Sequence, residues 1–122
     1  MSHDASLLGS ATGVNLNSAG SDTAIPIAAS KYIVRRVVVT NASTSLAVSA
    51  ATLGLFTGAG GTGTTVVTPA ILTALTSATK FLDQTLALTA DTLTAATLFI
   101  RNVLAHGSSA TVDVAIFGDI LS

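Results

Sequence analysis

Residue types that usually carry chemistry are scarce in this chain, and the few that occur are widely spaced. Charged residues make up 9% of its 122 residues, and it contains neither Cys nor Glu, whereas an ordinary soluble domain carries about 25% charged residues. The two histidines are His3 and His106, and the six aspartates show no spacing typical of a metal-binding loop. We therefore expect no metal, no cofactor and no enzymatic activity.

Two short segments contain parts of known site motifs. The run Gly58-Ala-Gly-Gly-Thr-Gly63 has the spacing of a dinucleotide-binding loop, but such a loop opens a helix, and strand-like residues follow here. His106 lies near Ser108, Ser109 and Asp113 in the sequence, but no strand-to-helix elbow motif presents a nucleophile. Both segments are better explained as turns, the first at the tip of a hairpin and the second between two strands.

The pair Arg35-Arg36 is the most unusual charged feature. Neighbouring residues on a strand point to opposite faces, and the segment around this pair is apolar on both faces. One Arg should therefore approach the interior, where a buried charge needs a partner. An ion pair with an Asp and a contact across a subunit interface both fit, since Arg is enriched at interfaces. Together with Tyr32 and Phe117, the pair forms our candidate oligomer or partner interface.

Apolar residues alternate with a period of two along almost the whole chain, which predicts strands. Near the C-terminus Val112, Val114, Ile116 and Ile120 fall on one face, and the first three should line the core. Turn-forming residues separate the predicted strands, which cover residues 13–17, 23–28, 31–40, 51–57, 64–68, 80–88, 97–104 and 111–120. The predicted fold class is all-β, a jelly-roll-like β-sandwich of about eight short strands. At most one short helical turn is expected, within residues 69–79, where an ordered loop is the alternative.

A single domain is predicted for residues 13–122. Residues 1–12 follow neither the strand nor the helix period, so they are predicted to be an N-terminal arm or tail. An arm that orders only against a partner would dock through Ser2, His3, Asp4, Leu7 and Leu8. The opening residues lack the basic and apolar regions of a signal peptide.

The low charge also bears on partners. A net charge of −1 with only five Lys and Arg is not the basic footprint of a nucleic-acid-binding protein. No apolar run approaches the roughly 20 residues that a membrane-spanning helix needs. Because a free soluble domain carries about 25–35% charged residues on its surface, we expect much of this surface to be buried in a homo-oligomer, with a trimer as the expected form.

Four segments carry a family resemblance: Gly13-Val-Asn-Leu, Ser21-Asp-Thr-Ala-Ile-Pro-Ile, Lys31-Tyr-Ile-Val-Arg-Arg-Val-Val-Val-Thr-Asn-Ala-Ser and Ile116-Phe-Gly-Asp-Ile. They resemble small structural proteins of tailed bacteriophages that are encoded near the head genes. The resemblance implies a capsid decoration (cement) protein, a commonly trimeric β-sandwich made in the host cytoplasm. It would bind the major capsid protein on the outer surface of the virion and clamp neighbouring capsomers.

From the composition and the lack of site motifs we also expect no small-molecule substrate, no nucleic-acid partner and no membrane partner. Two alternatives stay open at this point. One is another virion component, such as a tail or fibre part. The other is a carbohydrate-binding β-sandwich, although such modules usually display aromatic platforms and this chain contains only one Tyr and four Phe.

Overall fold

A computed structural model describes residues 6–76, 78–87 and 92–121 of the chain, and these residues form eight β-strands and no helix. The strands are β1 (Ser6–Asn15), β2 (Ser21–Pro26), β3 (Tyr32–Thr40), β4 (Thr52–Gly58), β5 (Thr62–Ile71), β6 (Phe81–Gln84), β7 (Thr97–Leu104) and β8 (Thr111–Ile120). Each overlaps one of the eight strands predicted from the sequence. Since the described residues contain no helix, none of them forms a helical membrane span.

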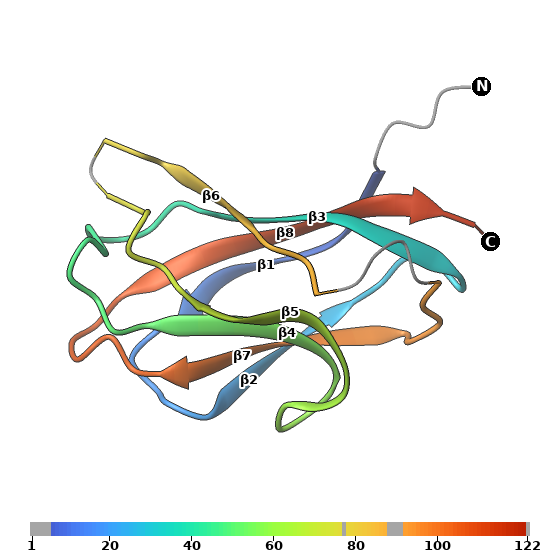
Figure 1. The fold of residues 1–122 in the computed structure, drawn as a ribbon, viewed down its shortest axis with the longest axis horizontal. Helices are drawn as coiled ribbons and strands as arrows, with labels where there is room; N and C mark the ends of the chain where they lie inside the picture. The colour runs from blue at the N-terminus through green and yellow to red at the C-terminus, as the bar shows by residue number, and fades with distance from the viewer. Residues whose placement is uncertain (1–5, 77, 88–91, 122) are drawn as a thin grey trace.

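The strands form two antiparallel sheets that face each other (Figure 1). Sheet A has the order β1-β8-β3-β6, and sheet B has the order β2-β7-β4-β5. The first strand therefore pairs with the eighth, the second with the seventh, the third with the sixth and the fourth with the fifth. This nesting of hairpin pairs is the jelly-roll form of the β-sandwich, and it confirms the predicted fold class.

The core lies between the two sheets and is built from alternate residues of each strand. On β8, Val112, Val114 and Ile116 are at most 1% exposed, as predicted, while the residues between them point outward. Ile120, which the alternation places on the same face, is 48% exposed at the end of the strand. Burying each such side chain contributes roughly 1.5–3 kcal/mol. Sheet B contributes the facing layer, which includes Ile25, Leu53, Leu55, Leu98 and Ile100.

Strand β1 corrects the predicted N-terminal arm, because Ser6–Asn15 pairs with β8 along its length. Leu8 is 1% exposed and belongs to the core, whereas Leu7 is 53% exposed on the surface. Two register shifts interrupt the alternation of this strand, and that interruption hid it from the sequence pattern. The other three predicted docking residues, Ser2, His3 and Asp4, lie outside the described residues.

Of the two alternatives predicted for residues 69–79, the structure shows the ordered loop, which follows the end of β5 at Ile71, as far as these residues are described. Pro69 belongs to β5, which is an edge strand of sheet B, and edge strands are where a sheet tolerates proline. After β5, the Leu75 N–H donates to the Leu72 carbonyl at 3.0 Å, and both side chains are buried. The Leu46 N–H donates to the Leu75 carbonyl at 2.8 Å, so this loop is fastened to the β3–β4 connection.

Candidate assembly surface

The outer face of sheet A gathers most of the charged residues that the sequence analysis singled out. Residues opposite each other on neighbouring strands share a face, so the register assigns the members of this surface. They are Leu7 and Ser10 on β1, Asp113, Ala115, Phe117 and Asp119 on β8, Ile33, Arg36, Val38 and Thr40 on β3, and Phe81 and Asp83 on β6.

A β-bulge in β3 places both arginines on the outside. Val34 lies opposite Gly118 and Arg36 lies opposite Phe117, so Arg35 is an extra residue between them. An extra residue of this kind reverses the alternation that follows it. Both Arg side chains are therefore exposed, at 47% and 53%, and the prediction that one of them approaches the interior was wrong.

Gly118 is the residue that gives the bulge room. A β-carbon at this position would collide with the backbone carbonyl of Ile33 and would lie 2.9 Å from Leu8 Cδ1. Neither partner can yield easily, because one is backbone and the other is packed in the core. The bulge in β3 and the glycine in β8 therefore form one structural unit.

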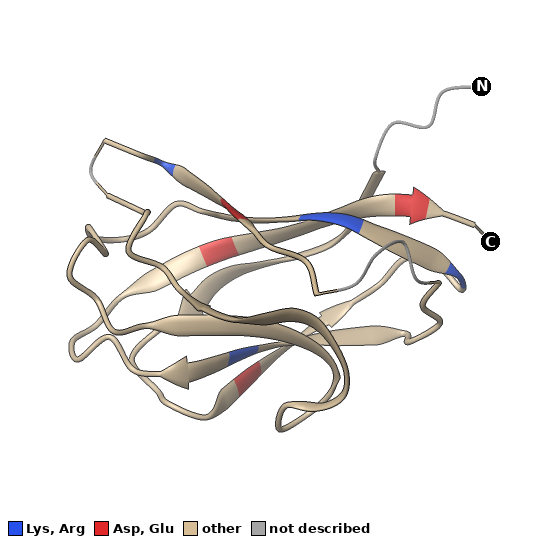
Figure 2. Ribbon diagram, in the orientation of Figure 1, with Lys and Arg blue, Asp and Glu red and all other residues tan. Residues whose placement is uncertain are grey.

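Each arginine of the bulge pairs with an aspartate of a neighbouring strand. Arg35 Nε lies 2.8 Å from Asp119 Oδ2, and the Arg36 guanidinium bonds both carboxylate oxygens of Asp83. The hydrogen bond to Asp83 and the charge of that carboxylate raise the pKa of Arg36. Figure 2 shows these opposite charges side by side on an otherwise mostly uncharged ribbon.

Such exposed pairs contribute little to folding, because water and salt screen them. Their larger effect is to neutralise the charge of this surface locally. With Arg101 paired to Asp22 on the other sheet, all three arginines of the chain are bound to an aspartate of the same chain.

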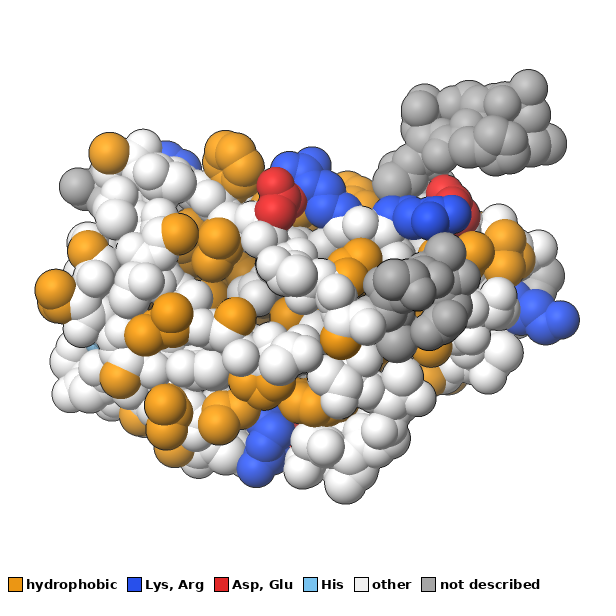
Figure 3. Space-filling model, in the orientation of Figure 1, with side chains coloured by type: hydrophobic (Ala, Val, Ile, Leu, Met, Phe, Trp, Pro, Cys, Tyr) orange, Lys and Arg blue, Asp and Glu red, His pale blue; other side chains and the backbone are white. Residues whose placement is uncertain are grey.

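Apolar side chains lie between these ion pairs. Leu7 is 53% exposed and is the cross-strand partner of Phe117, which is itself partly exposed. In the next row, Ala115 on β8 is partly exposed, whereas its partner Val38 on β3 is only 7% exposed. Figure 3 shows the result along the upper rim, where red and blue atoms touch and orange atoms lie between them.

Tyr32 is not part of this surface, which corrects its assignment to the interface. Its side chain is fully buried, and its hydroxyl donates a hydrogen bond of 2.6 Å to the Ala95 carbonyl. Burial raises the pKa of this hydroxyl. Because the bulge reverses the alternation after Val34, Tyr32 faces the core together with Val37 and Val39, while Phe117 does lie on the outer face.

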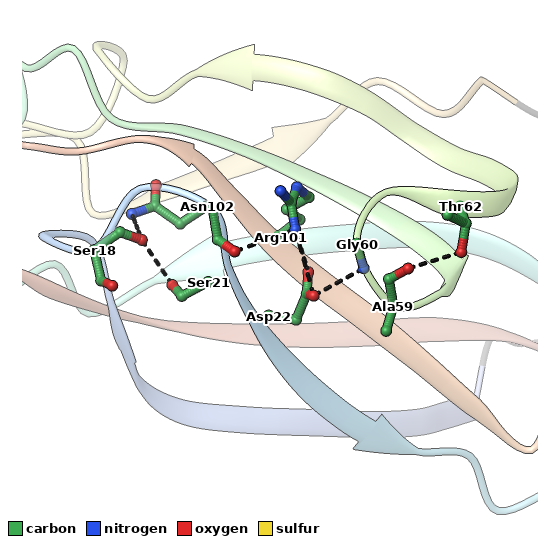
Figure 4. A network of polar contacts seen from close by, with 9 residues as sticks. Ser18, Ser21, Asp22, Ala59, Gly60, Thr62, Arg101 and Asn102 are labelled. Carbon is green, nitrogen blue, oxygen red and sulfur yellow. Dashed lines mark hydrogen bonds and ion pairs between the residues drawn. The ribbon is translucent and has the colours of Figure 1, made fainter.

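The glycine-rich run forms the tip of the β4–β5 hairpin, as predicted, and it is fastened in place (Figure 4). Gly60 and Gly61 have φ angles of 74° and 76°, which glycine adopts readily. The Gly60 N–H donates to Asp22 Oδ2 at 2.8 Å, and Arg101 Nη1 lies 3.2 Å from Asp22 Oδ1. Strand β5 follows the tip, so no helix N-terminus is available for a phosphate.

His106 bonds a residue that the sequence analysis did not consider. Its Nδ1 lies 2.6 Å from Ser49 Oγ, and Ser49 Oγ also accepts the Ala51 N–H at 2.9 Å. Asp113 instead accepts the Gly13 N–H and the Asn41 amide. The described residues therefore do not assemble Asp113 with His106 as a triad, and they contain no cluster of three or more metal-binding side chains.

Two buried side-chain amides, those of Asn102 and Gln84, were not identified in the sequence analysis, although the sequence pattern indicates their burial. Asn102 is 1% exposed and its Nδ2 donates to the Ser18 carbonyl at 3.1 Å. Asn102 continues the inward-facing row of Leu98 and Ile100. The alternation of this strand therefore places a polar residue at a core position, and this could have been recognised from the sequence. Gln84, at 9% exposed, is placed in the same way on β6.

No protein-family model, no curated protein and no solved structure matches this chain.

Proposed function

We propose that this chain is a virion structural protein, a decoration (cement) protein on the outer surface of the head of a tailed bacteriophage. It works without catalysis, as a homo-oligomer with a trimer as its expected form. The observation that carries this proposal is the outer face of sheet A, where apolar side chains alternate with arginines already neutralised by aspartates.

Such a surface is suited to burial against another copy of the chain. A lone charge is costly to bury, whereas a paired and hydrogen-bonded charge has already replaced part of its hydration. The ion pairs contribute both signs equally, so a neighbouring copy meets no strong repulsion. In a closed ring of three, each copy uses two different patches, so this face would contact a different surface of the next copy.

The fold and the resemblance support the same proposal at different levels. Jelly rolls occur in viral capsid proteins and in lectins, and a fold alone does not select between them. The four segments that resemble phage head-associated proteins favour the first. The partner is then the major capsid protein, and the chain acts by bracing the shell after its synthesis in the host cytoplasm.

Co-sedimentation with phage heads tests this proposal. Purified protein is mixed with mature heads that lack their decoration protein, prepared from the phage that encodes this chain, and the heads are pelleted. We expect saturable binding that survives about 1 M salt, where the Debye length falls to about 3 Å, because so few charges are left for long-range attraction. Protein that stays in the supernatant with heads but pellets with isolated tails would overturn the head assignment in favour of a tail component.

A further inference from the structure

The loop end of the sandwich, at the left of Figure 1, contains a hollow that shares only Thr40 with the outer face of sheet A. Its volume is about 640 Å³, which is within the range of about 300–1,000 Å³ typical of small-molecule sites. The β3–β4 connection forms one wall and the β5–β6 connection forms the other. The residues that line it are Thr40, Asn41, Ala42, Ser43, Thr44, Ser45, Leu75, Thr76, Thr79 and Lys80.

The walls of this hollow are held in place by hydrogen bonds. The Leu46 N–H donates to the Leu75 carbonyl at 2.8 Å and so joins the two connections. Ser43 is tied to the start of β8, since its N–H donates to the Thr111 carbonyl and its hydroxyl accepts the Thr111 N–H. Thr76 Oγ1 accepts the Thr79 N–H at 3.0 Å. The hollow is therefore formed before any ligand arrives, which lowers the entropic cost of binding.

Asn41 is the most constrained residue of the wall. Its φ of 53° is positive, which no other described non-glycine residue shows, and such conformations gather at functional sites. Its Nδ2 donates to Asp113 Oδ2 at 3.0 Å. That bond fixes the orientation of the amide and leaves the Asn41 amide oxygen as an acceptor.

The chemistry of the lining selects the ligand class. Hydroxyl side chains and one amide dominate it, Leu75 provides an apolar floor, and Lys80 is the only charged residue among the lining residues. A single cation is too little for a nucleotide's phosphates, which require several charged or backbone donors. Neutral donors and acceptors at this density match a ligand that itself carries many hydroxyl groups.

An exposed aromatic side chain lies next to the lining residues. Phe81 is 53% exposed, and it is the cross-strand partner of the lining residue Thr40 on the outer face of sheet A. Directly opposed residues have β-carbons about 4.5–5.5 Å apart, so Phe81 lies beside the hollow without being part of its lining. We propose that this hollow binds a neutral saccharide, with one sugar face against the Phe81 ring and its hydroxyl groups bonded to the Asn41 amide and the threonine hydroxyls.

Nuclear magnetic resonance titration of the full chain tests this proposal. The probes are glucose, galactose, mannose and N-acetylglucosamine, each as a monosaccharide and as a linear trisaccharide. We expect saturable shifts of the Thr40–Ser45 and Thr79–Phe81 amides with at least one probe, with a dissociation constant on the order of 1 mM. The absence of saturable shifts with every probe, or shifts confined to other parts of the chain, would overturn the proposal.

Variants then separate the site from non-specific contact. Phe81→Ala should weaken binding by about tenfold or more, whereas Leu104→Ala, at an equally exposed residue outside the hollow, should leave it unchanged. Asn41→Gly keeps a residue that tolerates the positive φ and removes the amide, so it should also weaken binding. Equal affinities for all three variants and the wild type would contradict the assigned site, and an unchanged amide spectrum away from each substitution shows that the fold is retained.

Discussion

Gly118 shows how one residue decides the character of a whole surface. The bulge at Arg35 turns two arginines outward only because no side chain on β8 occupies the space next to the Ile33 carbonyl. Without the bulge, the alternation of β3 would direct one of these arginines into the core, where an unpaired charge is strongly destabilising.

Gly118→Ala should therefore lower the free energy of unfolding by about 1–3 kcal/mol, as overpacking of a filled site does. Chemical denaturation measures the loss. Ser108→Ala, at an exposed loop residue, is the matched control and should stay within about 0.5 kcal/mol of the wild type. If both variants unfold at the same denaturant concentration, the close approach of β3 to Gly118 is not a constraint.

The burial of Tyr32 should make the stability of the fold depend on pH in the alkaline range. The ionisation of this one residue can be followed by absorbance, because the chain contains one Tyr and no Trp. Burial raises the pKa of this hydroxyl in the folded chain above its ordinary value of about 10. The stability contributed by the neutral hydroxyl is then fully present below about pH 10 and is lost as the pH rises through the folded pKa.

Tyrosinate absorbance should accordingly appear at a higher pH in the native protein than in urea-unfolded protein. Tyr32→Phe should remove this part of the alkaline pH dependence, at the cost of the hydrogen bond to the Ala95 carbonyl. Coincident titration curves for the native and the unfolded protein would show that the hydroxyl is accessible to water.

At the scale of elements, the eight strands follow from the sequence because apolar alternation and turn residues mark them independently of their partners. The sequence could not predict the register in which neighbouring strands pair. The face assignment of β3 failed at Arg35, and the part of β1 before Gly13 was assigned to an arm, because a bulge breaks the period of two without leaving a signature in residue type. The aspartate partners of the arginines were unpredictable for the same reason, since they depend on which strands become neighbours.

The tip of the β4–β5 hairpin is held by a contact with Asp22, a residue that lies far from it in the sequence. Asp22 on β2 accepts the Gly60 N–H and pairs with Arg101, and both charged side chains are only about a quarter exposed, at 22% and 26%. Hydrogen bonds to charged groups contribute about 1.5–3 kcal/mol, which is more than an exposed ion pair contributes.

Asp22→Ala should release the hairpin tip and speed hydrogen exchange of the Gly60 amide, with a measurable loss of global stability. Asp83→Ala is the matched control, because its ion pair with Arg36 is about half exposed on both sides and should contribute little. An unchanged exchange rate at Gly60 in Asp22→Ala would show that the hairpin is held by its own turn alone.

At the scale of the whole molecule, the jelly roll separates two surfaces. On the outer face of sheet A both arginines are paired with aspartates of the same chain, and the hollow lined by Asn41 and Lys80 lies at the loop end. In Figure 1 this loop end lies opposite the end where β1 begins and β8 finishes. Assembly near Leu7 and Phe117 would therefore leave the hollow open to solvent.

The molar mass in solution tests the central claim, that the outer face of sheet A mediates self-association. Light scattering coupled to size-exclusion chromatography should give three times the 12.1 kDa chain mass for the wild type at micromolar concentration. Leu7→Glu places a charge in this face and should shift the mass toward that of a single chain. Val48→Glu, at a loop residue that is 97% exposed, should leave the wild-type mass unchanged. A wild-type mass of 12.1 kDa, or a mass that Leu7→Glu leaves unchanged, would contradict the account.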